Sequence, residues 1–369
     1  MNKNTSRSSN IELLRILAMA FIVASHYTAH GLKAECVGMD VRLHYSFLQM
    51  GGPIGVNLFV MASGYFMVKS SISMPRIGKV LFHVISYSAI LSAMAFFVGS
   101  PLFDVNLQLA IKRSLGIAGT GVYWFINVYL ALMLLVPFLN ILVHQITKKQ
   151  HLLCICTLTG LSCVFPACFL IPTYSGKICL FMALYMVAAY LRLYPLLELT
   201  KRKLVYVGAA VLLIILAFLG AANIAFEYFH SEYVSSILIN SATSQESILM
   251  LLVAIPIFIL FLKINVGSSR IINFLASCTL GVYLFHEHPL MRDFIWQKVL
   301  HTAYAPYCEH PILHCIGAIL GIYIVGTLVD IIWQQTIGRL YAPTERFIIM
   351  PIYTRMKKLG NGIIQRIVE

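Results

Sequence analysis

The strongest constraint on the fold of this chain is a series of about ten long apolar stretches, each about as long as a helix that crosses a lipid bilayer (roughly 17–25 residues). Short segments connect them, and none is long enough to fold as a separate soluble domain. Hydrophobic residues make up 59% of the 369 residues and charged residues only 11%, too few to cover the surface of a soluble protein of this length. We therefore predict an all-α fold, a polytopic membrane bundle with about ten transmembrane helices. The predicted spans are about residues 11–30, 53–69, 77–100, 122–143, 151–171, 178–195, 204–224, 247–262, 271–290 and 311–335.

The basic residues indicate how such a bundle is oriented. If the N-terminus is cytoplasmic, 19 of the 27 Lys and Arg residues lie in cytoplasmic segments and 7 lie in outer segments. This bias follows the positive-inside rule, and an even number of spans then places both termini in the cytoplasm. The same bias explains the net charge of +13, so we predict no nucleic acid partner.

The two ends of the chain receive separate predictions. The first apolar stretch follows a basic segment, as in a signal peptide, but it contains Glu12 and Arg15 and lacks a convincing cleavage site, so we expect it to be retained. Residues 1–335 are predicted to form one transmembrane domain, and residues 336–369 a basic amphipathic cytoplasmic tail. That tail either lies along the anionic cytoplasmic leaflet or is disordered.

The nine cysteines give no sign of a metal centre. They are scattered, with no Cys-x-x-Cys pair and no Cys/His ligand spacing, so we predict no metal site. Cys36 and Cys308 fall in outer loops, where they either form a disulfide or remain unpaired. Most of the others lie within predicted spans, where cysteine acts as a small apolar residue.

Three ionisable residues share one face of the first apolar stretch. A helical residue turns by about 100° and rises about 1.5 Å, so His26 lies three turns plus about 20° beyond Arg15 and roughly 16 Å farther along the axis. Glu12, three residues before Arg15, lies on the same face. Because ionisable groups are costly against lipid, we expect this stripe to line the bundle interior or an aqueous cavity. The alternatives are a helix cap formed by Glu12, an Arg15 that reaches the headgroups, and an interfacial His26.

Four motifs, in order along the chain, carry a resemblance to a known family. They are Asn10–Arg15 (NIELLR) followed after ten residues by His26, Asn57–Tyr65 (NLFVMASGY), Tyr123–Phe125 (YWF) leading to Leu135–Pro137 (LVP), and Ser277–His286 (SCTLGVYLFH). Over nearly the whole chain, the sequence resembles the acyltransferase-3 family of integral membrane acyltransferases.

The resemblance implies an O-acyltransferase of the bacterial cytoplasmic membrane. It would move an acetyl group from cytoplasmic acetyl-CoA, its co-substrate, to a hydroxyl of a cell-surface polysaccharide or its lipid-linked precursor. The expected partners are this acyl-CoA donor, the sugar acceptor and membrane lipids, and the sequence leaves open whether a homo-oligomer is needed. Arg15 and His26 match the essential Arg and His of the family. Its Arg-x-x-Arg element, taken to bind the donor, corresponds to Arg76 and Lys79, where a bidentate contact is lost.

This chemistry assigns roles to the candidate residues. Arg15, Arg76 and Lys79 can bind the anionic nucleotide of acetyl-CoA. Its extended thiol arm is about as long as the roughly 16 Å that separates Arg15 from His26, so His26 either acts as general base or transiently carries the acyl group.

Three further residues complete the catalytic candidates. Glu12 shares the face of Arg15 and His26. Tyr283 and His286 lie on adjacent parts of one helix face, at the predicted depth of His26. There one of them either orients the base or stabilises the oxyanion, or both simply lie at the membrane interface.

Two other interpretations remain open. In a transporter, Glu12, Arg15, His26 and Asp330 would bind a polar solute or relay protons, although the sequence has no inverted repeat. In an accessory subunit without activity, changing His26 would matter little. Asp330, near the inner end of the last span, either pairs with Arg15 or contacts water, and the Ser63-Gly64 pair is interpreted as a close helix contact.

Overall fold

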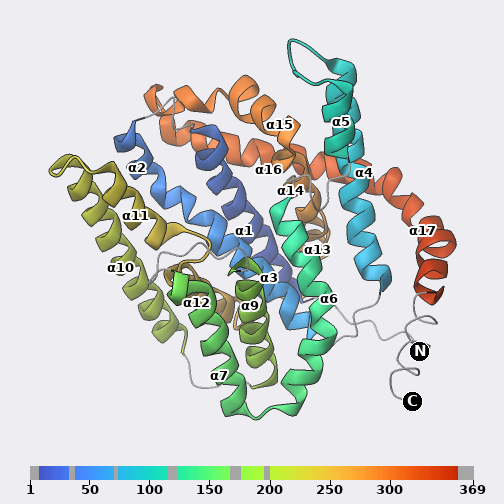
Figure 1. Cartoon of the computed structure of the whole chain (residues 1–369), viewed down its shortest axis with the longest axis horizontal. Helices are drawn as coiled ribbons and strands as arrows, with labels where there is room; N and C mark the ends of the chain where they lie inside the picture. Colours follow the sequence, from blue (N-terminus) through green and yellow to red (C-terminus); the bar gives the residue numbers. More distant parts are fainter. Residues whose placement is uncertain are drawn as a thin grey trace.

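The computed structural model describes residues 8–32, 38–69, 74–114, 123–166, 176–194 and 200–355. Within these ranges the chain is mostly helical and contains no strand, which confirms the predicted all-α class. The helices gather into one bundle (Figure 1).

Seven helical segments in the described ranges are long and apolar enough to cross a membrane, so a multi-pass membrane bundle is confirmed. They are α1 (Ser9–His26) with its π-helical extension Tyr27–Gly31, α4 (Met74–Val98), α6 (Trp124–Gln145), α9 (Gly176–Leu193), α10 (Lys201–Glu227), α11 (Glu232–Thr243) together with α12 (Ile248–Leu262), and α16 (Pro311–Gln335).

The other three predicted spans are helical but shorter or interrupted. Helix α3 (Gly51–Met67) has 17 residues, and α7 (Lys148–Thr159) continues into a π-helical turn. Helices α13 (Arg270–Ser277) and α14 (Thr279–Glu287) meet at a turn at Cys278. The count of ten spans and the cytoplasmic termini therefore remain predictions. The remaining helices are α2 (Met39–Gln49), α5 (Leu107–Ser114), α15 (Pro289–Asp293) and α17 (Tyr341–Thr344), with shorter π or 3-10 turns at Phe294–Val299, Thr302–Tyr307, Ile337–Leu340 and Glu345–Ile349.

Helices α1 and α3 pack closely near the middle of the bundle (Figure 1). Two glycines of α3 make this possible, because a Cβ at Gly51 would lie 2.5 Å from the carbonyl oxygen of Phe21, and one at Gly55 would lie 2.4 Å from that of Ala18. On its other side α3 meets α9 and α12. A Cβ at Gly64 would lie 3.3 Å from side-chain atoms of Ala188 and Tyr185 on α9, closer than ordinary van der Waals contact, consistent with the close helix contact expected there.

The first part of the predicted tail, up to residue 355, is helical and packs on α4. The Tyr341 hydroxyl donates a hydrogen bond to the carbonyl oxygen of Pro75, and Ile349 lies against Gly78. Up to residue 355 the tail is thus packed on the bundle, and its place along the cytoplasmic leaflet remains a prediction. Phe347 and Ile348 are exposed beside Arg346, as expected of a segment that lies along a membrane surface. Residues 356–369 lie outside the described ranges.

Asp330 of α16 forms the centre of a buried polar cluster, which matches neither alternative given for it, a pairing with Arg15 or contact with water. Its Oδ1 accepts hydrogen bonds from the Tyr87 hydroxyl (2.9 Å) and from His83 Nε2 (3.1 Å), and its Oδ2 accepts one from Gln334 (2.6 Å). The His83 ring stacks on Trp333 with 3.8 Å between ring centroids. Fully buried, Asp330 neither meets water nor contacts Arg15 within the described residues, because three donors from α4 and α16 already satisfy its oxygens.

This cluster leads to a stability prediction at Gly281, the glycine of the fourth motif. A Cβ there would lie 1.9 Å from Oδ1 of Asp330, whose carboxylate is held by its three donors. We expect Gly281→Ala to lower the free energy of unfolding by about 1–3 kcal/mol, as overpacking does. Thermal unfolding in detergent measures it. Gly317→Ala on α16, where a Cβ meets nothing within 4 Å, is the matched control and should cause no loss. Equal midpoints for the two variants would contradict the prediction.

Candidate functional site

The cations predicted to bind the donor line a single cavity of about 1310 Å³, which we call the Arg15 cavity. Arg15 reaches it from α1, and Arg76 and Lys79 reach it from α4. Arg192 of α9, which was not among the predicted donor-binding residues, joins them. Four cations from three helices therefore surround one space, an arrangement suited to a polyanion.

Arg15 is held in place by groups on both sides. Its Nη1 lies 3.3 Å from Oε1 of Glu12, and its guanidinium lies over the rings of Phe59 and Phe66, 5.9 Å from each centroid. Arg15 Nε is buried with no hydrogen-bond partner among the described residues, as is Nε of Arg192. Buried donors normally have a partner, so both atoms are available to a bound anion.

Glu12 belongs to this cavity rather than to the surroundings of His26. It is buried, lines the Arg15 cavity and pairs with Arg15. Fourteen residues separate it from His26, about 21 Å along a helix. The geometry therefore supports Glu12 as a group that orients Arg15, and it does not bring Glu12 to the catalytic candidates. The alternative in which Glu12 caps the helix finds no support, because Ser8 is the N-cap and Glu12 is then the fourth helical residue, one position beyond that of a capping box.

A second cavity, of about 470 Å³, lies at the other end of α1, and we call it the His26 cavity. Its lining includes the predicted residues His26 and Tyr283. It also includes three residues that were not predicted from the sequence, His30, Glu287 and Arg292. Arg15 and His26 thus both line cavities, as the shared helix face predicts, and neither side chain faces lipid.

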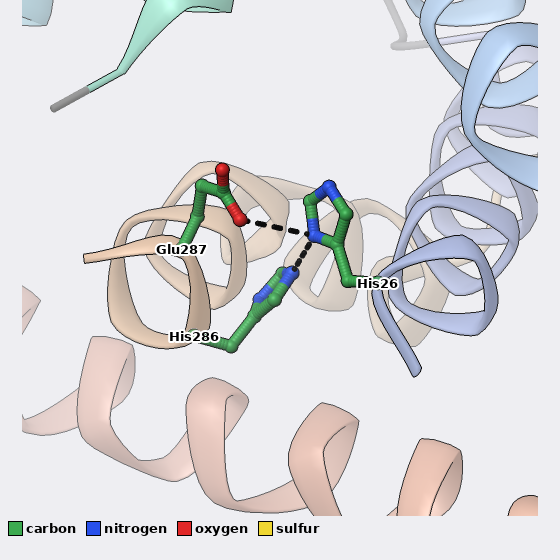
Figure 2. A group of neighbouring side chains, drawn as sticks. All are labelled: His26, His286 and Glu287. Carbon is green, nitrogen blue, oxygen red and sulfur yellow. Dashed lines mark hydrogen bonds and ion pairs between the residues drawn. The ribbon is translucent and has the colours of Figure 1, made fainter. Parts of the chain in front are cut away.

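His26 makes two contacts through the same ring nitrogen. Its Nδ1 lies 2.9 Å from Nε2 of His286 and 3.3 Å from Oε2 of Glu287. Figure 2 shows both contacts meeting at this atom, with the other ring nitrogen turned away from the pair. The partners come from the C-terminal end of α14, about 260 residues from His26 in the sequence.

The hydrogen-bond network assigns the tautomer of His26. His286 Nδ1 donates to the carbonyl oxygen of Val282 (2.6 Å), which leaves a lone pair on Nε2 of neutral His286. The proton between the two rings therefore belongs to Nδ1 of His26, which donates to His286 and is shared with Glu287. Nε2 of His26 keeps its lone pair, and no contact within the described residues engages it. This nitrogen is placed to act as a base.

Glu287 connects the polar groups of the cavity. Its Oε2 accepts a hydrogen bond from His30 Nε2 (3.0 Å), and its Oε1 forms an ion pair with Arg292. The backbone carbonyl of Glu287 also accepts from Arg292 Nε (3.1 Å). Gln297 donates to the carbonyl oxygens of His30 and Gly31, which fixes the π-helical turn that follows His26. Glu287 is thus a carboxylate held beside the imidazole.

The donor atoms of His26, His286 and Glu287 lie within 4.8 Å of one another, a spacing that can hold a metal ion. The hydrogen bonds already described use these same atoms. Both oxygens of Glu287 have cationic or N–H partners, and Nδ1 of His26 carries the proton it donates to His286. We therefore interpret the group as a hydrogen-bond network, in which a cation would compete with Arg292.

The structure also shows where the remaining candidate histidines, Tyr283 and Cys308 lie. His286 is fully buried behind His26, so it touches His26 and does not line the cavity. The ring of Tyr283 lines the cavity, with its centroid 6.2 Å from that of His286. His288 is buried and caps α15 by accepting from the backbone N–H of Leu290. Cys308 is exposed, and Cys36 lies outside the described residues, so their pairing remains untested.

The residues missed by sequence reasoning left a weak signal. His30 follows His26 by four residues, and Glu287 stands between two histidines at the end of a predicted span. An acid at such a depth is a functional candidate in itself. What the sequence lacks is any local pattern that pairs one segment with the other.

The comparison with known families agrees with this geometry. The family model described as "Acyltransferase domain", that of the acyltransferase-3 family, matches residues 8–331. The matched region contains both cavities and the whole network around His26. No curated protein and no solved structure matches the chain. Since the match extends over most of the sequence, the chain belongs to the acyltransferase-3 family of membrane acyltransferases.

Proposed function

We propose that the protein is an O-acetyltransferase of the bacterial cytoplasmic membrane, with both termini in the cytoplasm. It moves an acetyl group from cytoplasmic acetyl-CoA to a hydroxyl of a cell-surface polysaccharide or its lipid-linked precursor. One observation carries the proposal: a cavity rich in cations and a cavity containing a free imidazole nitrogen lie at opposite ends of one helix and share lining residues. The family supports acyl transfer and disfavours the transporter interpretation.

The Arg15 cavity suits the donor. Acetyl-CoA carries its phosphates at one end and its thioester at the other. Arg15, Arg76, Lys79 and Arg192 can bind those phosphates, although the lysine offers a point charge where a second arginine would offer two parallel hydrogen bonds. The uncharged arm then extends about 16 Å along α1 toward His26.

The His26 cavity suits an acceptor with many hydroxyls. Apart from the polar groups around His26, its lining includes neutral donors and acceptors and an indole ring, contributed by Ser25, Gln49, Trp124, Thr243, Ser244 and Gln245. Amides and hydroxyls can bond sugar hydroxyls in either direction, and an aromatic ring offers an apolar face. A sugar is therefore the acceptor class that we propose.

The transfer step follows from the tautomer of His26. Nε2 of His26 takes the proton of the acceptor hydroxyl while that oxygen forms a bond to the thioester carbonyl carbon. The carbon–sulfur bond breaks as the tetrahedral intermediate collapses, and the imidazolium returns its proton to the departing thiolate. Glu287, 3.3 Å from Nδ1, stabilises the imidazolium between these two proton transfers. The products are an acetyl ester and free CoA.

The proposal is tested with purified protein in vesicles that carry a lipid-linked or surface glycan. Acetyl-CoA labelled in the acetyl group is supplied on the side of the Arg15 cavity. We expect label to appear on the glycan as an ester that alkali removes, and no label with protein-free vesicles. Label that stays on acetyl-CoA with every glycan from the native host, although the protein is folded, would refute the proposal.

Donor binding gives a separate prediction for Arg15. Because Arg15 supplies a fixed charge and a buried Nε, Arg15→Ala should weaken acetyl-CoA binding by about tenfold or more, the loss of one charge-assisted hydrogen bond. Arg15→Lys keeps the charge and should weaken binding less. Binding is measured by isothermal titration in detergent, with Arg270→Ala as the control, since Arg270 does not line the cavity. Wild-type affinity in both Arg15 variants would remove this residue from donor binding.

A further inference from the structure

The two cavities meet at three side chains that line both of them. These are Phe59 of α3, Phe125 of α6 and Leu280 of α14. None of the three side chains carries a polar atom. Each comes from a different helix, so together they can close the space between the cavities from three directions.

The partition is thin, and polar groups lie on both sides of it. On one side, the Arg15 guanidinium lies over the Phe59 ring, 5.9 Å from its centroid. On the other side, Tyr283 of the His26 cavity lies 5.7 Å from Phe125 by ring centroids. Among the described residues, one layer of apolar side chains therefore separates the Arg15 guanidinium from the His26 cavity. Hydrophobic constrictions of this kind block ions because water does not stay in them.

The three residues differ in how firmly they are held. Phe125 is buried, and its ring has aromatic neighbours at 5.7–5.8 Å in Tyr129, Phe181 and Tyr283, besides Phe59. Phe59 and Leu280 are only partly buried. The Phe125 ring is fixed on several sides, whereas the two partly exposed side chains have room to move. We therefore expect Phe59 and Leu280 to be the side chains that move when the two cavities connect.

We propose that Phe59, Phe125 and Leu280 form an apolar seal between the two cavities, which opens around the uncharged arm of the donor and selects the acyl group by its width. Ions cannot cross the closed seal, and the charged nucleotide stays with its cations. An acetyl group is no wider than the arm that follows it, whereas an aromatic acyl group is wider. The acyl selection rests on the proposed function, but the closure does not.

The closure is tested on the full chain in vesicles without donor or acceptor. Removing both mobile side chains, in Phe59→Ala/Leu280→Ala, should raise chloride efflux on the order of tenfold over the wild-type protein, because water then bridges the cavities. Phe66→Ala is the matched control: Phe66 lies on the same helix, and Arg15 is 5.9 Å from its centroid too, but it lines only the Arg15 cavity. Vesicles with the Phe66→Ala variant should release chloride at the wild-type rate.

Selection by width is tested with the same proteins. The double variant should raise the rate with benzoyl-CoA relative to acetyl-CoA on the order of tenfold, and Phe66→Ala should leave this ratio unchanged. If the double variant does not fold, Leu280→Trp takes its place: the larger ring should reduce acetyl transfer on the order of tenfold while acetyl-CoA still binds.

The outcomes separate the seal from the proposed function. The seal is overturned by a folded double variant with wild-type chloride efflux and a wild-type ratio of the benzoyl-CoA rate to the acetyl-CoA rate. A Leu280→Trp variant that transfers acetyl at the wild-type rate overturns it too. Increased efflux limited to the double variant supports the seal. If efflux rises in this way but no form of the protein transfers acetyl, the seal stands and the proposed function fails.

Discussion

Replacing His26 by Ala is expected to reduce acetyl transfer by about 10²–10⁴-fold, the usual contribution of a general base. The loss should lie in kcat, with little change in the KM for acetyl-CoA, because the donor cations line the other cavity. The rate of label transfer to the glycan measures it. His310→Ala removes an exposed histidine outside both cavities and should transfer label at the wild-type rate.

Added imidazole distinguishes a lost base from a distorted fold. The side chain removed from His26 leaves room beside a cavity of about 470 Å³, and free imidazole can enter it. There it can accept the proton of the acceptor hydroxyl, so we expect it to restore part of the transfer in His26→Ala and none in Arg15→Ala. Full transfer by His26→Ala without imidazole would show that His26 is not the base. The interpretation of the chain as an inactive subunit likewise predicts that this substitution has little effect.

The sequence predicted those features of the site that depend on one helix. The spacing of Arg15 and His26 places both on one face, and in the structure both line cavities. The same regular turn of about 100° per residue also placed Glu12 on that face, where it pairs with Arg15. Helix periodicity gives the direction of a side chain, but it does not say which partner another helix brings to it.

The parts that could not be predicted depend on contacts between distant segments. Glu287 reaches His26 from about 260 residues away, and Asp330 takes His83 of α4 as a partner where the sequence offered Arg15. Both pairings depend on how α14 and α16 pack, which the absence of a side chain at Gly281 helps to decide. The number of spans depends on packing in the same way, because α3 is short and largely buried and its apolar surface faces other helices.

Replacing Glu287 by Gln is expected to reduce kcat by about 10²-fold. In a Ser–His–Asp triad, the change of the acid to its amide costs more, roughly 10⁴-fold, because the imidazole then adopts the wrong tautomer. Here His286 Nε2 still accepts the Nδ1 proton of His26, so the tautomer is kept and only the stabilisation of the imidazolium is lost. Glu287 thus acts through His26 as a positioning residue.

Three measurements separate this role from a structural one. The KM for acetyl-CoA should not change in Glu287→Gln, because the donor cations line the other cavity. Glu287→Asp keeps the charge at a greater distance from Nδ1 and should retain more transfer than Glu287→Gln. Glu232→Gln removes an exposed carboxylate outside the cavity and should have no effect.

Chelation distinguishes the network from a metal centre built on the same atoms. If His26, His286 and Glu287 held an essential cation, a strong chelator would abolish transfer by the wild-type protein. The Glu287→Gln variant would also lose transfer, because one ligand of the cation would be missing. With Arg292 paired to Glu287 and the Nδ1 proton of His26 donated to His286, we expect full transfer after chelation. A chelated protein that recovers only when a metal is returned would instead make Glu287 a ligand, with Arg292 displaced from its carboxylate.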